Sequence, residues 1–249
     1  MPLYYIPTLF TRFDKLIAAE STRHGGISPA PYGSLNLGIN TPDDSANVDE
    51  NRRRFFEAIG AGSSVPFASS HQVHGTEVLL ATKAGRYDGY DALITSQPGL
   101  LIGVTVADCV PILIYDTQHQ VVAAIHAGWR GTTGGIVSKT LEAMQHHFAT
   151  KPDDCYAYVG TCIDETSFEV GPEVAEQFAP NFKRSDPYTQ KNYVNLKAAN
   201  TKLLTDFGIP SAQIGISPFS TVLNNDDYFS HRTEKGQTGR MLAVIGLKP

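Results

Sequence analysis

The sequence has no long apolar run. Nothing in its 249 residues approaches the roughly 18 consecutive apolar residues that a membrane-spanning helix needs, so we expect no membrane partner. The first ten residues lack a basic stretch followed by an apolar one, which is not typical of a signal peptide. Cysteine is also scarce, and an odd number of widely spaced cysteines favours a reducing compartment over a disulfide framework. The cysteines are Cys109, Cys155 and Cys162. We therefore predict a cytoplasmic protein.

Basic residues are too sparse for a dedicated nucleic-acid binder. The net charge is −5, and the single basic run, Arg52–Arg54, is predicted to lie on the exposed face of a helix. The glycine-rich signatures of dinucleotide and P-loop sites are missing too. Hydrophobic residues make up 41% and charged residues 18%, as in soluble globular proteins. We expect small-molecule partners, and a chain that is a monomer or a homodimer.

Strand and helix patterns mix without a regular β–α–β rhythm. Apolar, β-branched runs bounded by turn residues predict strands at residues 16–20, 76–82, 100–106, 112–115, 121–125, 157–159, 214–217 and 241–247. Helical spacing and capping residues predict helices at residues 47–59, 134–148 and 195–207, with another beginning near Gly171. Residues 24–40 read as a long ordered loop. We predict an α/β (mixed α+β) class, as one layered domain over residues 1–249 with mixed sheets flanked by helices.

Two histidines and a cysteine form the most distinctive chemical set. His74, Cys109 and His126 each lie beside a predicted strand, and Pro111 helps to confine Cys109 to a tight link between strands. Neutral imidazoles and a thiolate bind zinc or copper readily. The ends of strands are where α/β sheets build their sites, so the three side chains can converge. A set of three leaves a fourth coordination position for water or substrate, as in catalytic zinc sites.

The residues around this set suggest hydrolysis or phosphorolysis. A thiolate and two neutral imidazoles leave one positive charge on Zn²⁺, which lowers the pKa of a bound water toward about 7. The segment after His126 contains Gly128, Arg130, Gly131 and Thr132, followed by a predicted helix. Backbone N–H groups and the Arg130 guanidinium therefore predict an oxyanion cradle.

Structural roles explain each of these residues about as well when they are taken singly. A cysteine after a strand is usually a small core residue, and a lone histidine there is usually structural. Trp129 can fill the core while the surrounding glycines form an ordinary turn. His71 competes with His74, because Gln72 and Val73 allow either ring to face inward.

The ordered motifs resemble the laccase-domain family, also called polyphenol oxidoreductases or YfiH-like proteins, whose members are also regarded as purine nucleoside phosphorylases. The matching segments run nearly from end to end, at residues 22–28, 34–38, 50–52, 72–76, 91–93, 105–111, 126–131, 168–171, 229–230 and 238–241. Three positions depart from the usual pattern: Ser220 precedes Thr221 where cysteine is usual, His231 follows Ser230, and Gly160–Thr161 replaces a Gly-Pro pair. These departures bear on loop details and substrate preference.

The resemblance implies a zinc site built from His74, Cys109 and His126, with copper as the alternative metal. It implies phosphorolysis of adenosine, inosine and S-methyl-5′-thioadenosine, together with deamination of adenosine. It also implies a layered α/β fold related to bacterial toxin deamidases that use Cys and His. We predict Cys109, His126 and Arg130 as catalytic residues. Arg130, Asn36 and Asp91 are our candidates for binding nucleoside or phosphate, and Asp91 is alternatively expected to orient a ligand histidine.

Two other activities compete with this one. A copper-dependent phenol oxidase was the family's earlier assignment, but blue-copper oxidases need several copper sites with many histidine ligands, and this chain has eight histidines. A metal-free hydrolase would use Cys109 as the nucleophile and His126 as the base, with Asp108 or Asp91 orienting the imidazole.

Overall fold

Two six-stranded sheets form the centre of the molecule. In the computed structural model, which describes residues 2–62 and 64–249, the first sheet contains, in spatial order, β1 (Tyr4–Tyr5), β2 (Leu16–Ser21), β15 (Met241–Leu247), β7 (Leu101–Val106), β3 (Phe67–His71) and β5 (Gly85–Asp88). The second contains β14 (Ile214–Ile216), β10 (Cys155–Val159), β8 (Val110–Asp116), β9 (Val121–Ala127), β6 (Ala92–Thr95) and β4 (Val78–Leu80). Both sheets mix parallel and antiparallel pairs, as the sequence predicts.

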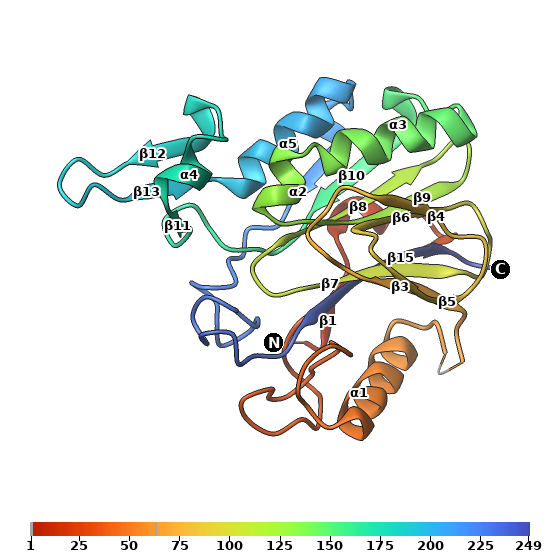
Figure 1. Ribbon diagram of the computed structural model, residues 1–249. Coiled ribbons are helices and arrows are strands. Elements are labelled where there is room, and N and C mark those ends of the chain that lie inside the picture. Colours follow the sequence, from red (N-terminus) through yellow and green to blue (C-terminus); the bar gives the residue numbers. More distant parts are fainter. Residues whose placement is uncertain (1, 63) are drawn as a thin grey trace.

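Helices cover the outer face of each sheet, which gives four layers (Figure 1). On one side lie α2 (Trp129–Thr133), α3 (Ile136–Phe148) and α5 (Leu196–Phe207), and on the other lies α1 (Ser45–Ala58). A three-stranded unit projects from the body and contains β11 (Glu169–Val170), β13 (Asn192–Val194), β12 (Lys183–Ser185) and the short helix α4 (Pro172–Ala175). Four 3₁₀ turns join these elements, at Thr8–Phe10, Pro152–Asp154, Pro180–Phe182 and Ser211–Gln213.

The apolar cores follow the layers. Alternate residues of β7, β8, β9 and β15 fill the space between the two sheets, including Ile102, Leu113, Val122 and Ile245. The opposite faces of the strands pack against helices: one core joins β8, β9 and β10 to α3 and α5, and another joins the first sheet to α1. Because both faces of the central strands are buried, these strands are apolar at almost every position.

Helix ends follow the local sequence signals. The Asn195 side chain accepts a hydrogen bond from the Ala198 N–H (2.9 Å), and Gly208 ends α5 in the left-handed conformation with φ 107°. The predicted helix at residues 134–148 corresponds to α3, which begins at Ile136 because Gly135 has φ 78° and separates it from the short helix α2, which was not predicted. The helix predicted to begin near Gly171 is α4, whereas strands β11, β12 and β13 beside it and strands β1, β3, β5 and β6 were not predicted, because they are short or carry polar residues.

The chain crosses from one sheet to the other at two places that matter for the site. Residues 72–77 lead from β3 in the first sheet to β4 in the second, and residues 107–109 lead from β7 to β8. His74 and Cys109 lie on these crossings. His126 was predicted directly after a strand, but it lies within β9, opposite Pro111 of β8. The strand is longer than predicted because the ladder between β8 and β9 continues to Ala127.

Candidate metal centre and its cavity

His74, Cys109 and His126 converge. One nitrogen of each imidazole and the thiol sulfur all lie within 4.8 Å of one another, and the two imidazole rings meet edge to face with centroids 4.8 Å apart. His126 is buried, Cys109 is partly buried and His74 is exposed, so the set opens to solvent on the His74 side. His71, the alternative to His74, points elsewhere and pairs through Nδ1 with Asp88 on the surface (2.8 Å).

Gly128 gives the three ligands the room they need. A Cβ atom at this position would lie 2.9 Å from Cδ2 of His74 and 3.1 Å from Sγ of Cys109. Both distances are shorter than normal contacts with a side chain, so any other residue would push the ligands apart. A glycine here, two soft nitrogen ligands and one thiolate fit a zinc or copper ion.

Asp91 fixes the orientation of two of the ligands. It is completely buried, and its Oδ1 accepts hydrogen bonds from Nδ1 of His126 (2.8 Å) and the backbone N–H of His74 (3.0 Å). Its Oδ2 accepts from the N–H groups of Val73 (3.1 Å) and Gly75 (2.7 Å). With Nδ1 of His126 engaged by the carboxylate, Nε2 is left for a metal.

The same carboxylate stabilises an unfavourable backbone. His74 has φ 59°, a left-handed conformation that is uncommon for a residue other than glycine. That conformation turns three successive N–H groups toward one point, which forms an anion-binding nest. Asp91 was a candidate for binding substrate at the cavity wall. Because it fills the nest, it lies behind the candidate ligands and does not reach that wall.

Charge coupling favours the metal-binding form of the cysteine. Burial alone would raise the pKa of the Cys109 thiol, but the charge and hydrogen bonds of His126 and His74 lower this pKa to about 6. Burial would likewise lower the pKa of His126, yet Cys109 and Asp91 raise it to about 9. The pair therefore favours a Cys109 thiolate beside a protonated His126. The thiolate is the form of cysteine that coordinates a metal ion, and metal binding would release the proton from the imidazole.

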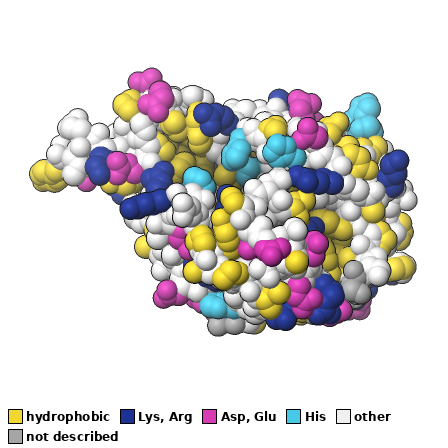
Figure 2. Space-filling view, turned by 60° about the horizontal axis from the view of Figure 1, so that its bottom comes forward, with side chains coloured by type: hydrophobic (Ala, Val, Ile, Leu, Met, Phe, Trp, Pro, Cys, Tyr) yellow, Lys and Arg dark blue, Asp and Glu magenta, His cyan; other side chains and the backbone are white. Residues whose placement is uncertain are grey.

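The three side chains lie at the end of a cavity of about 480 Å³. This volume is in the range of small-molecule sites. Its wall is formed by residues of the first sheet, α1 and several connecting loops, namely Gly38–Thr41, Arg52, Ser69–Gln72, Gly103, Thr105–Asp108, Ile163, Phe168, His231, Arg232, Arg240 and Leu242. Figure 2 shows histidine and basic side chains gathered along a hollowed part of one face, between the projecting unit and the body.

None of the three predicted binding residues, Arg130, Asn36 and Asp91, lines this cavity. Arg130 is exposed on α2, where its guanidinium stacks on the Trp129 ring at 4.3 Å. Thr132, from the same predicted cradle, is buried, and its hydroxyl donates to the Gly128 carbonyl (2.9 Å). Asn36 is also completely buried. Its amide donates to Thr41 and Asp43 and accepts from the N–H groups of Gly38 and Arg240, so it shapes the loop that walls the cavity.

Several cavity residues were missed by the sequence reasoning. Arg52 was expected on an exposed helix face, but it lies three and four residues from Phe55, Phe56 and Val48, all of which are buried. That spacing was the available signal. Asp108 was considered only as a partner for histidine. Instead its carboxylate accepts from the Thr221 hydroxyl (2.5 Å) and the Arg232 N–H (2.7 Å), which ties the C-terminal loops to the Cys109 crossing.

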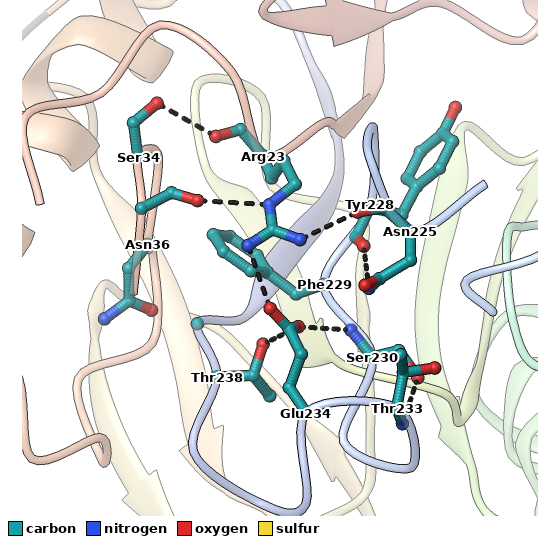
Figure 3. Close-up of polar contacts among 12 residues, drawn as sticks. Arg23, Ser34, Asn36, Asn225, Tyr228, Phe229, Ser230, Thr233, Glu234 and Thr238 are labelled. Atoms are coloured by element: carbon teal, nitrogen blue, oxygen red, sulfur yellow. Dashed lines mark hydrogen bonds and ion pairs between the residues drawn. The ribbon is translucent and has the colours of Figure 1, made fainter. Parts of the chain in front are cut away.

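A partly buried arginine, Arg23, joins the two loops that wall the cavity (Figure 3). Arg23 donates to the Gly33 carbonyl (3.1 Å) on one loop, and to the Asn225 carbonyl (2.7 Å) and Glu234 (2.9 Å) on the other. Its guanidinium also lies over the Phe229 ring, 4.6 Å from the centroid. Arg23 does not line the cavity, so its contacts act on the site through the position of these loops.

The four layers and the open three-ligand set define a mixed α/β protein with a candidate metal centre at the end of a small-molecule cavity. The chain belongs to the family described as multi-copper polyphenol oxidoreductase laccase, whose model matches residues 17–248. This confirms the resemblance drawn from the motifs.

Characterised relatives and solved structures agree with that assignment. The chain is 36% identical over 243 residues to a purine nucleoside phosphorylase of Bacteroides thetaiotaomicron, covering 90% of this chain and 89% of the relative. It is 37% identical over 235 residues to the purine nucleoside phosphorylase YfiH of Escherichia coli, covering 92% and 93%. The crystal structure of YlmD from Geobacillus stearothermophilus has a TM-score of 0.90 at 32% identity, covering 96% and 94%.

Proposed function

We propose that this protein is a zinc-dependent purine nucleoside phosphorylase. The observation that carries the proposal is the convergence of His74, Cys109 and His126 at the end of a cavity of about 480 Å³. Full-length similarity to proteins named purine nucleoside phosphorylase supports the reaction class. The substrates are then a purine nucleoside, such as adenosine, inosine or S-methyl-5′-thioadenosine, and inorganic phosphate.

The reaction exchanges one bond at the anomeric carbon. The bond between ribose C1′ and the purine N9 breaks, and its electron pair leaves with the base, which takes up a proton. A phosphate oxygen forms the new bond to C1′, giving ribose 1-phosphate. His74, Cys109 and His126 would hold the zinc ion, which supplies a Lewis acid at its free coordination position when bound.

The other residues around the centre would position the ligands and the substrates and would exclude water from the cavity. Asp91 holds His126 and the His74 backbone in the ligand geometry. Arg23, Asp108 and Asn36 hold the loops that enclose the substrates, which restricts the orientation of the two reactants. We propose that residues 1–249 act as one domain, since β15 from the C-terminal segment lies between β2 and β7 in one sheet.

Adenosine deamination is the second activity we propose for the same centre. There a water oxygen replaces the C6 amino group, so adenosine and water give inosine and ammonia. The open position next to three ligands supports this activity, because a metal there can activate an oxygen nucleophile.

Product analysis tests both reactions. Pure protein of measured zinc content is incubated with adenosine, with and without phosphate, and adenine, hypoxanthine, inosine and ribose 1-phosphate are quantified. Ribose 1-phosphate equal to the sum of adenine and hypoxanthine, formed only with phosphate, supports phosphorolysis, and phosphate-independent inosine supports deamination. Absence of all these products at high enzyme concentration would refute the proposal. Bound copper with oxygen uptake on a phenol would favour the oxidase, and turnover by metal-free protein would favour the Cys109 hydrolase.

A further inference from the structure

Three arginines line the cavity, and none has an acidic partner among the described residues. The exposed Arg232 donates instead to the carbonyls of Ser167 (3.5 Å) and Glu169 (2.9 Å). Arg52 and Arg240 both line the cavity and both are partly buried. Within residues 2–62 and 64–249, neither guanidinium forms an ion pair with a carboxylate, whereas Arg23, Arg53 and Arg54 each do. Partly buried cations without a counterion are unfavourable, which makes their positions informative.

Arg52 is held in place by aromatic rings and one carbonyl. Its guanidinium lies 5.1 Å from the Phe67 ring centroid and 5.7 Å from that of Phe56, and Nη1 donates to the Leu37 carbonyl (2.9 Å). Among the contacts of the described chain, Nε and Nη2 have no acceptor. Burial lowers the pKa of Arg52 to about 10, and the charge of Arg86 adds to this lowering, while Asp49 opposes it.

Arg240 is held against the same segment of chain. Nη1 donates to the carbonyls of Thr238 (2.8 Å) and Gly239 (2.9 Å), which leaves Nε and Nη2 without an acceptor in the described residues. Its aliphatic stem packs on Gly38, where a Cβ atom would lie 2.6 Å from Cγ of Arg240. Gly38 directly follows Leu37, so one short segment brings both guanidinium groups to the same part of the cavity.

We propose that Arg52 and Arg240 form a subsite for inorganic phosphate, within the cavity that also holds the candidate metal centre. The inference rests on the proposed function, because phosphorolysis needs a bound phosphate beside the nucleoside. Guanidinium groups bind tetrahedral oxyanions through paired N–H donors, and each arginine keeps such donors free. Asp108 also lines the cavity, but both of its oxygens already accept hydrogen bonds, from Thr221 and the Arg232 backbone.

The subsite is tested by phosphate titration in the absence of nucleoside. Calorimetry with zinc-loaded protein at constant ionic strength compares the wild type with Arg52→Met and Arg240→Met. Because a hydrogen bond to a charged group contributes about 1.5–3 kcal/mol, each substitution is expected to raise the phosphate dissociation constant about tenfold or more. The KM for phosphate should rise similarly, with little change in the KM for nucleoside. Arg52→Lys and Arg240→Lys keep the charge and should show smaller losses.

Matched controls separate the subsite from general charge effects. Arg53→Met removes the same charge from the next position of α1, where Arg53 pairs with Glu50 and Glu57. Arg130→Met removes the arginine first expected to bind phosphate. Both should leave phosphate affinity within about twofold of the wild type. Zinc content and circular dichroism are measured for every variant, and Arg240→Met carries the test if Arg52→Met does not fold.

The outcomes distinguish this inference from the proposed reaction. If Arg52→Met and Arg240→Met bind phosphate as tightly as the wild type, the subsite proposal is wrong, even if phosphorolysis occurs. Weakened binding in these variants would support it, even if no nucleoside is cleaved. Inosine 5′-monophosphate serves as a further probe. If it binds through the two arginines and free phosphate does not bind at all, the anion site belongs to a nucleotide and the proposal is wrong.

Discussion

Replacing Asp91 by asparagine should weaken the metal centre while leaving every metal ligand present. The carboxylate accepts four hydrogen bonds, two at each oxygen, from Val73, His74, Gly75 and His126. An amide keeps only one of these oxygens, and its NH₂ group then faces two N–H donors. Leaving a buried donor unsatisfied costs about 1–3 kcal/mol, so we expect the unfolding free energy to fall by about 2 kcal/mol or more. Metal affinity should fall about 10- to 100-fold, as for other residues that orient ligands.

The assay is zinc competition against a chromophoric chelator, with the folded fraction followed by circular dichroism. The molecule contains its own control, because Asp88 pairs with His71 through the same atoms and at the same distance of 2.8 Å. That pair is exposed, with side chains 82% and 52% accessible, against 0% and 4% for Asp91 and His126. Asp88→Asn should therefore change little. Equal zinc affinity for Asp91→Asn and the wild type would refute the argument that Asp91 orients the ligands.

Four other substitutions probe the centre and the buried interior. Gly128→Ala should reduce zinc affinity at least tenfold in the chelator assay, because the added Cβ displaces two ligands; wild-type affinity would show that the ligands have room to spare. Cys109→Ala should abolish both zinc binding and the thermal stabilisation that added zinc gives the wild type, whereas Cys155→Ala, in the apolar core, should retain both. Burial raises the pKa of Glu20 above its usual 4.5, so the stability that this group contributes is full below about pH 4.5 and is lost as pH rises through the raised pKa. Glu20→Gln should therefore raise the melting temperature more at pH 8 than at pH 5, and an equal shift at both would contradict this assignment.

The three candidate metal ligands could be found from the sequence because strand signals flank each of them. The apolar runs at residues 100–106 and 121–125 are strong patterns, and the soft-ligand side chains stand at or near their ends. The exact strand limits were not available, since the ladder between β8 and β9 is set by pairing and not by composition. The predicted strand ended at residue 125, directly before His126, whereas β9 continues to Ala127 and therefore includes His126.

The structure places the predicted phosphate-binding residue Arg130 outside the cavity, for a different reason. Arg130 follows His126 closely in the sequence, and this short separation suggested that its side chain lies near the site. Its direction is set by α2, which turns the side chain outward onto Trp129. Arg52 and Arg240 lie 188 residues apart, and both reach the cavity only because each contacts the loop at Leu37 and Gly38. Such a meeting depends on tertiary packing, which no local pattern in a single sequence encodes.

The position of the centre follows from how the two sheets are connected. His74 and Cys109 lie on two of the crossings that lead from the first sheet to the second, and His126 belongs to the second sheet itself. Asp91 lies on a third crossing, between β5 and β6, and binds both the His74 crossing and the His126 ring. A metal ion held by these ligands would therefore join the two sheets at the point where the chain passes between them. The ligands need no long loops to meet, since the fold already brings both crossings to the end of β9.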